Sequence, residues 1–208
     1  MPLYKIINCK KSSIYVWKIE ENLEQLLAEV KLKETSNLRL KTMTSISHQK
    51  GFLAVRMLLQ YLNLSDYDLF YSETGKPFLT TGKIISITHA HDFSVIMLSD
   101  GSCGIDIEKK KEKIIKIGPR FCDEAHLNEN HESKALAISK YTIAWGVKEA
   151  IFKIKNEAGI SFPKHITIEP FTKAEGYLNA KLFFNHKEEH FIASFQEFED
   201  YVLVWIET

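Results

Sequence analysis

Residues 83–108 read KIISITHAHDFSVIMLSDGSCGIDIE, and this stretch at the middle of the chain predicts two or three β-strands. A first break falls near His91 and Asp92, and a second falls at SDGS, where turn-forming residues gather. Because no low-complexity linker marks another boundary, SDGSC near residue 100 is the best candidate for a division of the chain into residues 1–101 and 102–208.

The segments on either side of this stretch predict helices and further strands. Upstream lie two β-rich runs within residues 4–19, a helix over 21–32, an amphipathic helix over about 44–62 and a hairpin over 70–79. Downstream lie a helical window over about 132–155 and four alternating segments typical of an antiparallel meander. This order of elements predicts an α+β fold, and the long helix in each half suggests a duplicated architecture without a residue-level repeat.

Composition excludes several classes of protein. The chain has 208 residues, 45% of them hydrophobic, and its 27 basic residues balance 27 acidic ones. No global field therefore favours nucleic acid or an anionic membrane as a partner. Three widely spaced cysteines fit neither a disulfide framework nor a zinc ligand set, and no stretch has the apolar length of a membrane span. We expect a cytoplasmic protein.

Two carboxylates in GIDIE and a third in the later helix form the most informative pattern. Side chains alternate along a strand, so Asp106 and Glu108 share one face. In the helical segment YTIAWGVKEAIFKI, Glu149 shares a face with Trp145 and Phe152, where burial of a charge is unfavourable. Three converging carboxylates would repel unless a hard cation such as Mg²⁺ lay among them.

Simpler explanations of these carboxylates stay open. The strand pair could form a solvated surface, and Glu149 could form a local ion pair with Lys153, four residues later on the helix. Lysines nevertheless surround the carboxylates, as a phosphate ligand of Mg²⁺ would require. They comprise the run Lys109, Lys110 and Lys111, the helix pair Lys148 and Lys153, and Lys76 on the hairpin.

Four ordered motifs resemble those of the 4′-phosphopantetheinyl transferases. GIDIE followed by WGVKEAIFK is similar to the family's paired signature, G-[IV]-D-x-E and W-[SCAG]-x-K-E-[AS]-x-x-K. GKPFL resembles its G-K-P segment, and ISITHAHDFSVIML resembles its I-S-x-S-H-S strand. By length and motif order the chain looks like the monomeric, surfactin-synthetase-activating type. That type implies two similar α+β halves with pseudo-twofold symmetry, each a small antiparallel sheet packed with a long helix.

The resemblance implies an activity and its residues. The reaction would be Mg²⁺-dependent transfer of 4′-phosphopantetheine from coenzyme A to a serine of an acyl or peptidyl carrier protein, releasing 3′,5′-ADP. Asp106, Glu108 and Glu149 would bind the metal from the C-terminal half. Lys148 and Lys153 would hold phosphate oxygens, Lys153 also stabilising developing charge, and Glu149 is the expected base for the serine proton.

The N-terminal half would contact the nucleotide. The resemblance implies that Lys76 and His89 bind the nucleotide end of coenzyme A, with His89 at the 3′-phosphate, while Thr88 stands where relatives often have serine. The lysine-rich connection at residues 109–116 is a candidate surface for the acidic carrier. The pathway served would be fatty acid synthesis or secondary metabolism.

Two departures from the family pattern motivate an alternative. His126, near Asp123 and Glu124, occupies a position where many relatives carry an acidic residue; it could be a base or an ordinary surface histidine. Residues 48–50 read HQK where many relatives have two arginines, and Arg56 in the following apolar run favours a structural role. The alternative is a non-catalytic homologue that binds coenzyme A or a carrier protein.

Overall fold

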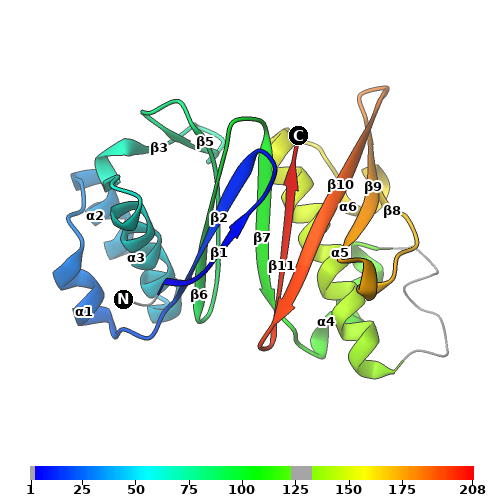
Figure 1. The fold of residues 1–208 in the computed structure, drawn as a ribbon, viewed down its shortest axis with the longest axis horizontal. Coiled ribbons are helices and arrows are strands. Elements are labelled where there is room, and N and C mark those ends of the chain that lie inside the picture. The colour runs from blue at the N-terminus through cyan, green and yellow to red at the C-terminus, as the bar shows by residue number, and fades with distance from the viewer. Residues whose placement is uncertain (1–2, 123–132) are drawn as a thin grey trace. The chain divides into compact units, whose positions relative to one another are not determined.

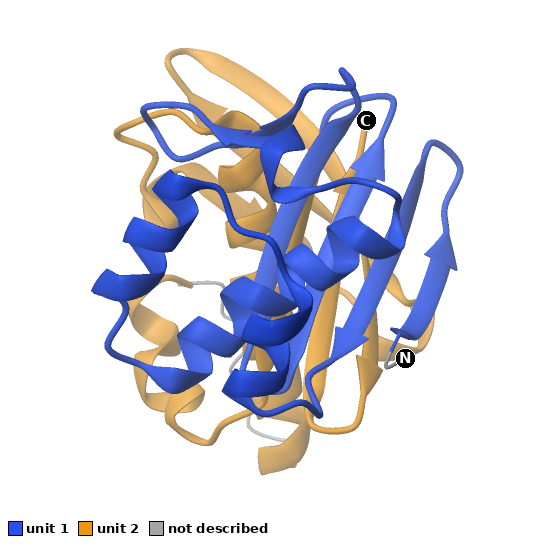
Figure 2. Ribbon diagram, turned by 90° about the vertical axis from the view of Figure 1, so that its left-hand side faces the viewer, with its two compact units in different colours: residues 1–102 blue, residues 103–208 orange. Residues whose placement is uncertain are grey.

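The computed structural model describes residues 3–122 and 133–208. The chain divides into two compact units, residues 1–102 and 103–208, which Figure 2 shows in separate colours. Each unit has its own hydrophobic core, so each is described by itself below.

The sheet of the first unit has four antiparallel strands in the order β1-β2-β6-β5 (Figure 1). These strands are β1 (Leu3–Asn8), β2 (Ser12–Lys18), β5 (Ile84–Ala90) and β6 (Phe93–Ser99). Strands β5 and β6 form a hairpin whose turn is His91 and Asp92, the first break that the sequence predicts. His91 adopts a left-handed backbone conformation with φ of 47° in this turn.

Three helices, a 3-10 turn and a short hairpin complete the first unit. They are α1 (Leu23–Glu29), α2 (Glu34–Thr42), α3 (Ile46–Tyr61), η1 (Asp66–Asp68) and the pair β3 (Leu69–Tyr71) and β4 (Pro77–Leu79). Helix α3 begins where Ser45 Oγ accepts a hydrogen bond from the His48 amide. Leu53 and Leu58 of α3 are fully buried in a core that also contains Ile96 of the sheet.

Arg56 is buried within α3 and has structural partners. Its Nε donates to Asp66 Oδ1 at 2.9 Å, and its guanidinium carbon lies 3.5 Å from the ring centre of Phe52. Removing either charge of this buried pair would leave the other uncompensated, so the pair fixes how α3 meets the η1 turn. Arg56 therefore has the structural role that the sequence favours.

The sheet of the second unit has five antiparallel strands in the order β7-β11-β10-β9-β8 (Figure 1). They are β7 (Cys103–Lys109), β8 (Ile166–Ile168), β9 (Tyr177–Phe184), β10 (Lys187–Phe198) and β11 (Tyr201–Glu207). The helical segments are α4 (Lys113–Ile117), η2 (Gly118–Arg120), α5 (Lys134–Lys155), α6 (Phe162–His165) and η4 (Lys173–Glu175). Helix α5, 22 residues long, packs against β7 and β11 at the centre of this unit.

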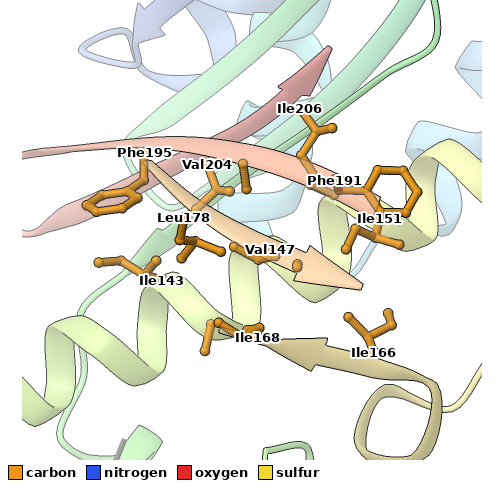
Figure 3. Close-up of a cluster of buried hydrophobic side chains, with 14 of the residues drawn as sticks. Ile143, Val147, Ile151, Ile166, Ile168, Leu178, Phe191, Phe195, Val204 and Ile206 are labelled. Carbon is orange, nitrogen blue, oxygen red and sulfur yellow. The ribbon is translucent and has the colours of Figure 1, made fainter. Parts of the chain in front are cut away.

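The apolar face of α5 explains why the helix lies on this sheet. Ile143, Val147 and Ile151 recur at intervals of four residues, so they lie on one face of the helix. Figure 3 shows them packed with Val204 and Ile206 of β11 in a fully buried cluster. Burial of these side chains is the main stabilising contribution to the position of α5.

The α+β class with antiparallel sheets is confirmed, with small differences at element ends. Helix α5 begins at Lys134 after the N-cap Ser133, close to the predicted start. Helix α2 was not predicted, because its sequence ETSNLRLKT is polar and shows little apolar periodicity. Over residues 3–122 and 133–208, no helix combines the length and apolarity needed to cross a membrane.

Candidate functional site

Strand β7 directs its two acidic side chains toward helix α5. Ile105 and Ile107 are buried on the opposite face of the strand. Asp106 forms an ion pair with Lys153 of α5, and Glu108 accepts a hydrogen bond from Trp145 of the same helix. The predicted sharing of a face by Asp106 and Glu108 is confirmed, and because Asp106 is only 5% exposed the simpler explanation of a solvated strand surface is wrong for it.

Two glycines allow the strand and the helix to approach closely. A Cβ atom at Gly104 would lie 2.1 Å from the carbonyl oxygen of Ala150 in α5. A Cβ atom at Gly146 would lie 2.7 Å from Cγ2 of Val204 and 3.8 Å from Oδ2 of Asp106. The glycines of GIDIE and WGVKE are therefore explained by steric contact between the elements that carry the carboxylates.

Replacing Gly104 with alanine is expected to destabilise the protein by about 1–3 kcal/mol or more, because the new methyl group meets a backbone atom that cannot rotate away. Urea unfolding of the purified variant measures this change. Ala174→Ser, at an exposed position of the same unit, is the control and should leave the unfolding midpoint unchanged. Equal stability of Gly104→Ala and the wild type would contradict the close approach of β7 and α5.

The Lys153 ammonium crosses from α5 to β7. Its Nζ donates to the Ile105 carbonyl oxygen at 2.7 Å and to Asp106 Oδ1 at 2.7 Å. The partner of Lys153 is thus an acidic residue on the strand, whereas the local explanation from helix spacing paired it with Glu149. One cation accordingly pairs with the strand carboxylate and also acts electrostatically on the helix carboxylate of Glu149.

Glu108 and Glu149 lie within electrostatic range of Asp106. Burial is the main cause that raises the pKa of Glu108 to about 7, and the negative charges of Asp106 and Glu149 add to it. The Trp145 hydrogen bond and Lys153 oppose this rise. Burial and the charge of Asp106 likewise raise the pKa of Glu149, while Lys153 lowers it. The charge of Asp106 therefore repels Glu108 and Glu149, and these two side chains take up protons more readily than isolated carboxylates.

This donor set fits a hard divalent cation by its chemistry. Carboxylate oxygens are the ligands that Mg²⁺ prefers, and a cation would relieve the mutual repulsion of the three groups. In the part of the chain that the structure describes, no three His, Cys, Asp or Glu side chains lie close enough together to hold a metal ion as they stand. Glu149 is only half-buried, which leaves space for its side chain to rotate toward Asp106, while Glu108 keeps its hydrogen bond to Trp145.

The raised pKa of Glu108 predicts a pH dependence of stability. Its folded-state pKa of about 7 exceeds the reference value of 4.5, so its contribution is fully present below about pH 4.5 and is lost as pH rises through about 7. We expect the free energy of unfolding of the metal-free protein to fall between about pH 5 and about pH 8. Urea unfolding at each pH measures it, and Glu108→Gln should reduce the slope. An identical slope in this variant would contradict the shift.

Lys148 does not lie with the carboxylates. Its side chain is fully buried, and Nζ donates to the carbonyl oxygens of Phe162 at 3.2 Å and Ile166 at 2.6 Å. In this position the ammonium group is enclosed by protein and bonded to backbone carbonyls. The expected phosphate contact of Lys148 is therefore at odds with its placement, which corresponds to a structural anchor between α5 and the segment around α6.

The site residues predicted in the first unit occupy the hairpin β3–β4 and strand β5. Lys76 lies in the turn of the hairpin, where its amide donates to Ser72 Oγ at 3.1 Å. Thr88 is buried on β5, and the next residue, His89, is exposed. The structure therefore presents Lys76 and His89 at the surface of this unit, but not Thr88.

His89 lies beside the N-terminus of helix α3. Its ring centre is 5.9 Å from that of His48, and a Cβ atom at Gly51 would lie 2.8 Å from its Nδ1 atom. The proximity of His48 and His89 was not predicted, because it depends on how α3 packs against β5. His126, together with Asp123 and Glu124, lies outside the described residues.

Two comparisons with known proteins found relatives of this chain. A model of the 4′-phosphopantetheinyl transferase superfamily matches residues 102–206, which nearly coincide with the second unit and include all three carboxylates. The 4′-phosphopantetheinyl transferase gsp of Aneurinibacillus migulanus is 30% identical over 107 residues. That match spans 50% of this chain and 45% of the relative, so the chain covers less than half the length of this curated relative.

Proposed function

Since the chain belongs to the 4′-phosphopantetheinyl transferase superfamily, we propose that it transfers 4′-phosphopantetheine from coenzyme A to a serine of an acyl or peptidyl carrier protein, in a Mg²⁺-dependent reaction that releases 3′,5′-ADP. The observation that carries this proposal is the juxtaposition of three interacting carboxylates with Lys153 inside the matched region. Such an arrangement suits a phosphoryl-transfer centre, where positioning and charge neutralisation supply most of the catalysis.

Asp106, Glu108 and Glu149 would hold Mg²⁺, which when bound supplies positive charge to the pyrophosphate of coenzyme A. The serine hydroxyl oxygen attacks the β-phosphorus in line, and a new oxygen–phosphorus bond forms as the bond to 3′,5′-ADP breaks. Glu149 would accept the serine proton as the transfer proceeds. Lys153 offsets the negative charge that accumulates on the leaving phosphate.

The residues of the first unit would bind the nucleotide of coenzyme A. Lys76 and His89 remain the proposed contacts because both are presented at the surface of that unit, with His89 at the 3′-phosphate. His48 adds a second imidazole beside His89 at the start of α3, where helix amides and the helix dipole favour an anion. Thr88, being buried, would act by supporting the strand on which His89 lies.

The carrier protein would dock beside Glu108. A hollow of about 200 Å³ lies there, with Lys109, Lys111 and Lys113 around the apolar side chains of Ile114 and Ile117. Charges of this sign attract an acidic partner and increase its rate of association. The three lysines of this surface fall within residues 109–116, the candidate surface for the carrier in the sequence.

The proposal also covers the symmetry, the oligomeric state and the cellular location of the protein. The two halves are proposed to be related by pseudo-twofold symmetry, which is supported by the combination of an antiparallel sheet and one long helix in each unit. The protein is proposed to act as a monomer. It is also proposed to act in the cytoplasm, in fatty acid synthesis or a secondary pathway, where coenzyme A and carrier proteins are available.

The test of the function is transfer to a carrier. The purified protein is incubated with coenzyme A, Mg²⁺ and a panel of apo carrier domains. The intact mass of each carrier is then measured by mass spectrometry. We expect addition of one phosphopantetheine group to at least one carrier, with loss of the modification in a carrier whose acceptor serine is alanine. Coenzyme A binding by calorimetry without modification of any carrier would instead identify a non-catalytic homologue.

A separate prediction concerns Lys148. Replacing Lys148 with methionine is expected to destabilise the protein by about 1–3 kcal/mol, because two carbonyl oxygens lose a buried donor. The affinity for coenzyme A, measured by calorimetry on the folded variant, should not change. Lys164→Met, at an exposed position in α6, is the control for both measurements. If Lys148→Met instead weakens coenzyme A binding and leaves stability unchanged, Lys148 contacts a phosphate as the resemblance implies.

A further inference from the structure

We infer that Trp145 is a positioning residue for Glu108, whose carboxylate it orients through its indole N–H for binding of a divalent cation. The inference rests on the proposed function, because it assigns a role to a side chain beside the proposed cation site. Trp145 Nε1 on α5 donates to Glu108 Oε1 on β7 at 3.1 Å. This bond restricts rotation of the carboxylate, and one oxygen atom held in this way leaves the second to face a cation. Outer partners of metal ligands typically act in this manner.

The direction of the indole N–H is fixed by aromatic packing. The ring centre of Trp145 lies 4.9 Å from that of Phe121 and 5.5 Å from that of Phe162, in edge-to-face arrangements. Phe162 in turn contacts Phe152 with ring centres 6.0 Å apart. Phe121 directly follows η2, Phe162 begins α6, and Phe152 lies in α5. Trp145 therefore cannot turn without disturbing several neighbours.

Lys148 supports the same arrangement through the backbone of Phe162. Its buried ammonium donates to the backbone carbonyls of Phe162 and Ile166, which ties the α6 segment to α5. Trp145 and Lys148 therefore act on geometry, whereas Glu149 and Lys153 of the same helix face Asp106. This division gives Lys148, which the resemblance places at a phosphate, a structural role instead.

Trp145→Phe separates the hydrogen bond from the packing, because phenylalanine keeps an aromatic ring but has no N–H. Mn²⁺ is titrated into the full-length metal-free protein by calorimetry, and transfer to a carrier is measured as a function of Mg²⁺. We expect Mn²⁺ affinity to fall on the order of 10-fold or more and the half-saturating Mg²⁺ concentration to rise correspondingly. The rate at saturating Mg²⁺ should recover most of the wild-type value.

The matched control is Trp205→Phe, which removes an indole N–H from β11 in the same unit and should leave Mn²⁺ affinity unchanged. A double-mutant cycle adds Glu108→Gln: once Glu108 is replaced, Trp145→Phe should cause no further loss of Mn²⁺ affinity. Wild-type affinity in Trp145→Phe, an equal loss in Trp205→Phe, or an undiminished effect of Trp145→Phe in the Glu108→Gln background would overturn the inference.

A second measurement applies if Trp145→Phe fails to fold. The chain contains three tryptophans, whose indole N–H resonances can be followed by ¹⁵N NMR in the otherwise native protein. Addition of Mg²⁺ should shift one of them, and Glu108→Gln should abolish that shift. If Mg²⁺ binds without shifting any indole resonance, the role of Trp145 is overturned while the cation site stands. A wild-type protein that binds neither Mg²⁺ nor Mn²⁺ overturns the cation site and this inference together.

Discussion

Glu149→Gln is expected to lower the rate of phosphopantetheine transfer by about 10²- to 10⁴-fold, because the substitution removes both a cation ligand and the group proposed to accept the serine proton. The amide is nearly isosteric with the carboxylate, and the wild-type side chain is only half-buried, so stability should change little. Initial rates with one apo carrier, at saturating coenzyme A and Mg²⁺, measure the effect. Folding is checked by circular dichroism and thermal unfolding.

The control for Glu149→Gln is Glu157→Gln just beyond α5. Glu157 carries the same charge and pairs with Lys155 at 3.4 Å, but its side chain is 44% exposed and lies after the helix end. This variant should transfer at the wild-type rate. Full activity of Glu149→Gln would contradict the assignment of Glu149 to the site, and equal losses in the two variants would show that the effect arises from net charge.

Lys153→Met is expected to lower the rate by about 10²- to 10³-fold, the size of effect seen when one electrostatic contact to a transition state is removed. It also removes the ion pair at 2.7 Å from Asp106, whose side chain is only 7% exposed. An uncompensated buried carboxylate is unfavourable, so the variant should in addition unfold at lower temperature. Addition of Mg²⁺ should recover part of this thermal stability, because the cation takes over the neutralisation of Asp106.

Lys155→Met provides the comparison for Lys153→Met. Lys155 lies two residues further along α5 and also forms an ion pair, with Glu189 at 2.6 Å, so a lysine and its salt bridge are lost in both variants. Only Lys153 faces the carboxylates, and we expect transfer by Lys155→Met to remain at the wild-type rate. Retention of activity in Lys153→Met would remove this residue from the mechanism.

The sequence is sufficient to predict those features that depend on local periodicity. Alternation along GIDIE places Asp106 and Glu108 on one face, and the apolar spacing of α5 predicts the helix that they meet. The break at His91 and Asp92 follows from turn chemistry in the same way. Four ordered motifs then indicate the family, which the match to residues 102–206 shows.

Features that depend on tertiary packing could not be predicted. Helix spacing pairs Lys153 with Glu149, but the approach of α5 to β7 through Gly104 brings Asp106 closer to its ammonium. Lys148 was expected at a phosphate from the resemblance to the family, yet its ammonium group donates to the backbone carbonyls of Phe162 and Ile166. The sequence did contain one indication of the hydrogen bond from Trp145, because a buried indole N–H usually has a partner.

The central claim is that Asp106, Glu108 and Glu149 share one divalent cation. Crystals of the protein grown with coenzyme A and Mn²⁺ test it most directly, because an anomalous difference map locates Mn²⁺ without reference to the surrounding atoms. The account predicts a single strong peak within coordination distance of carboxylate oxygens from all three residues. A map with Mn²⁺ elsewhere, or with Glu149 directed away from Asp106 and the ion, would contradict it.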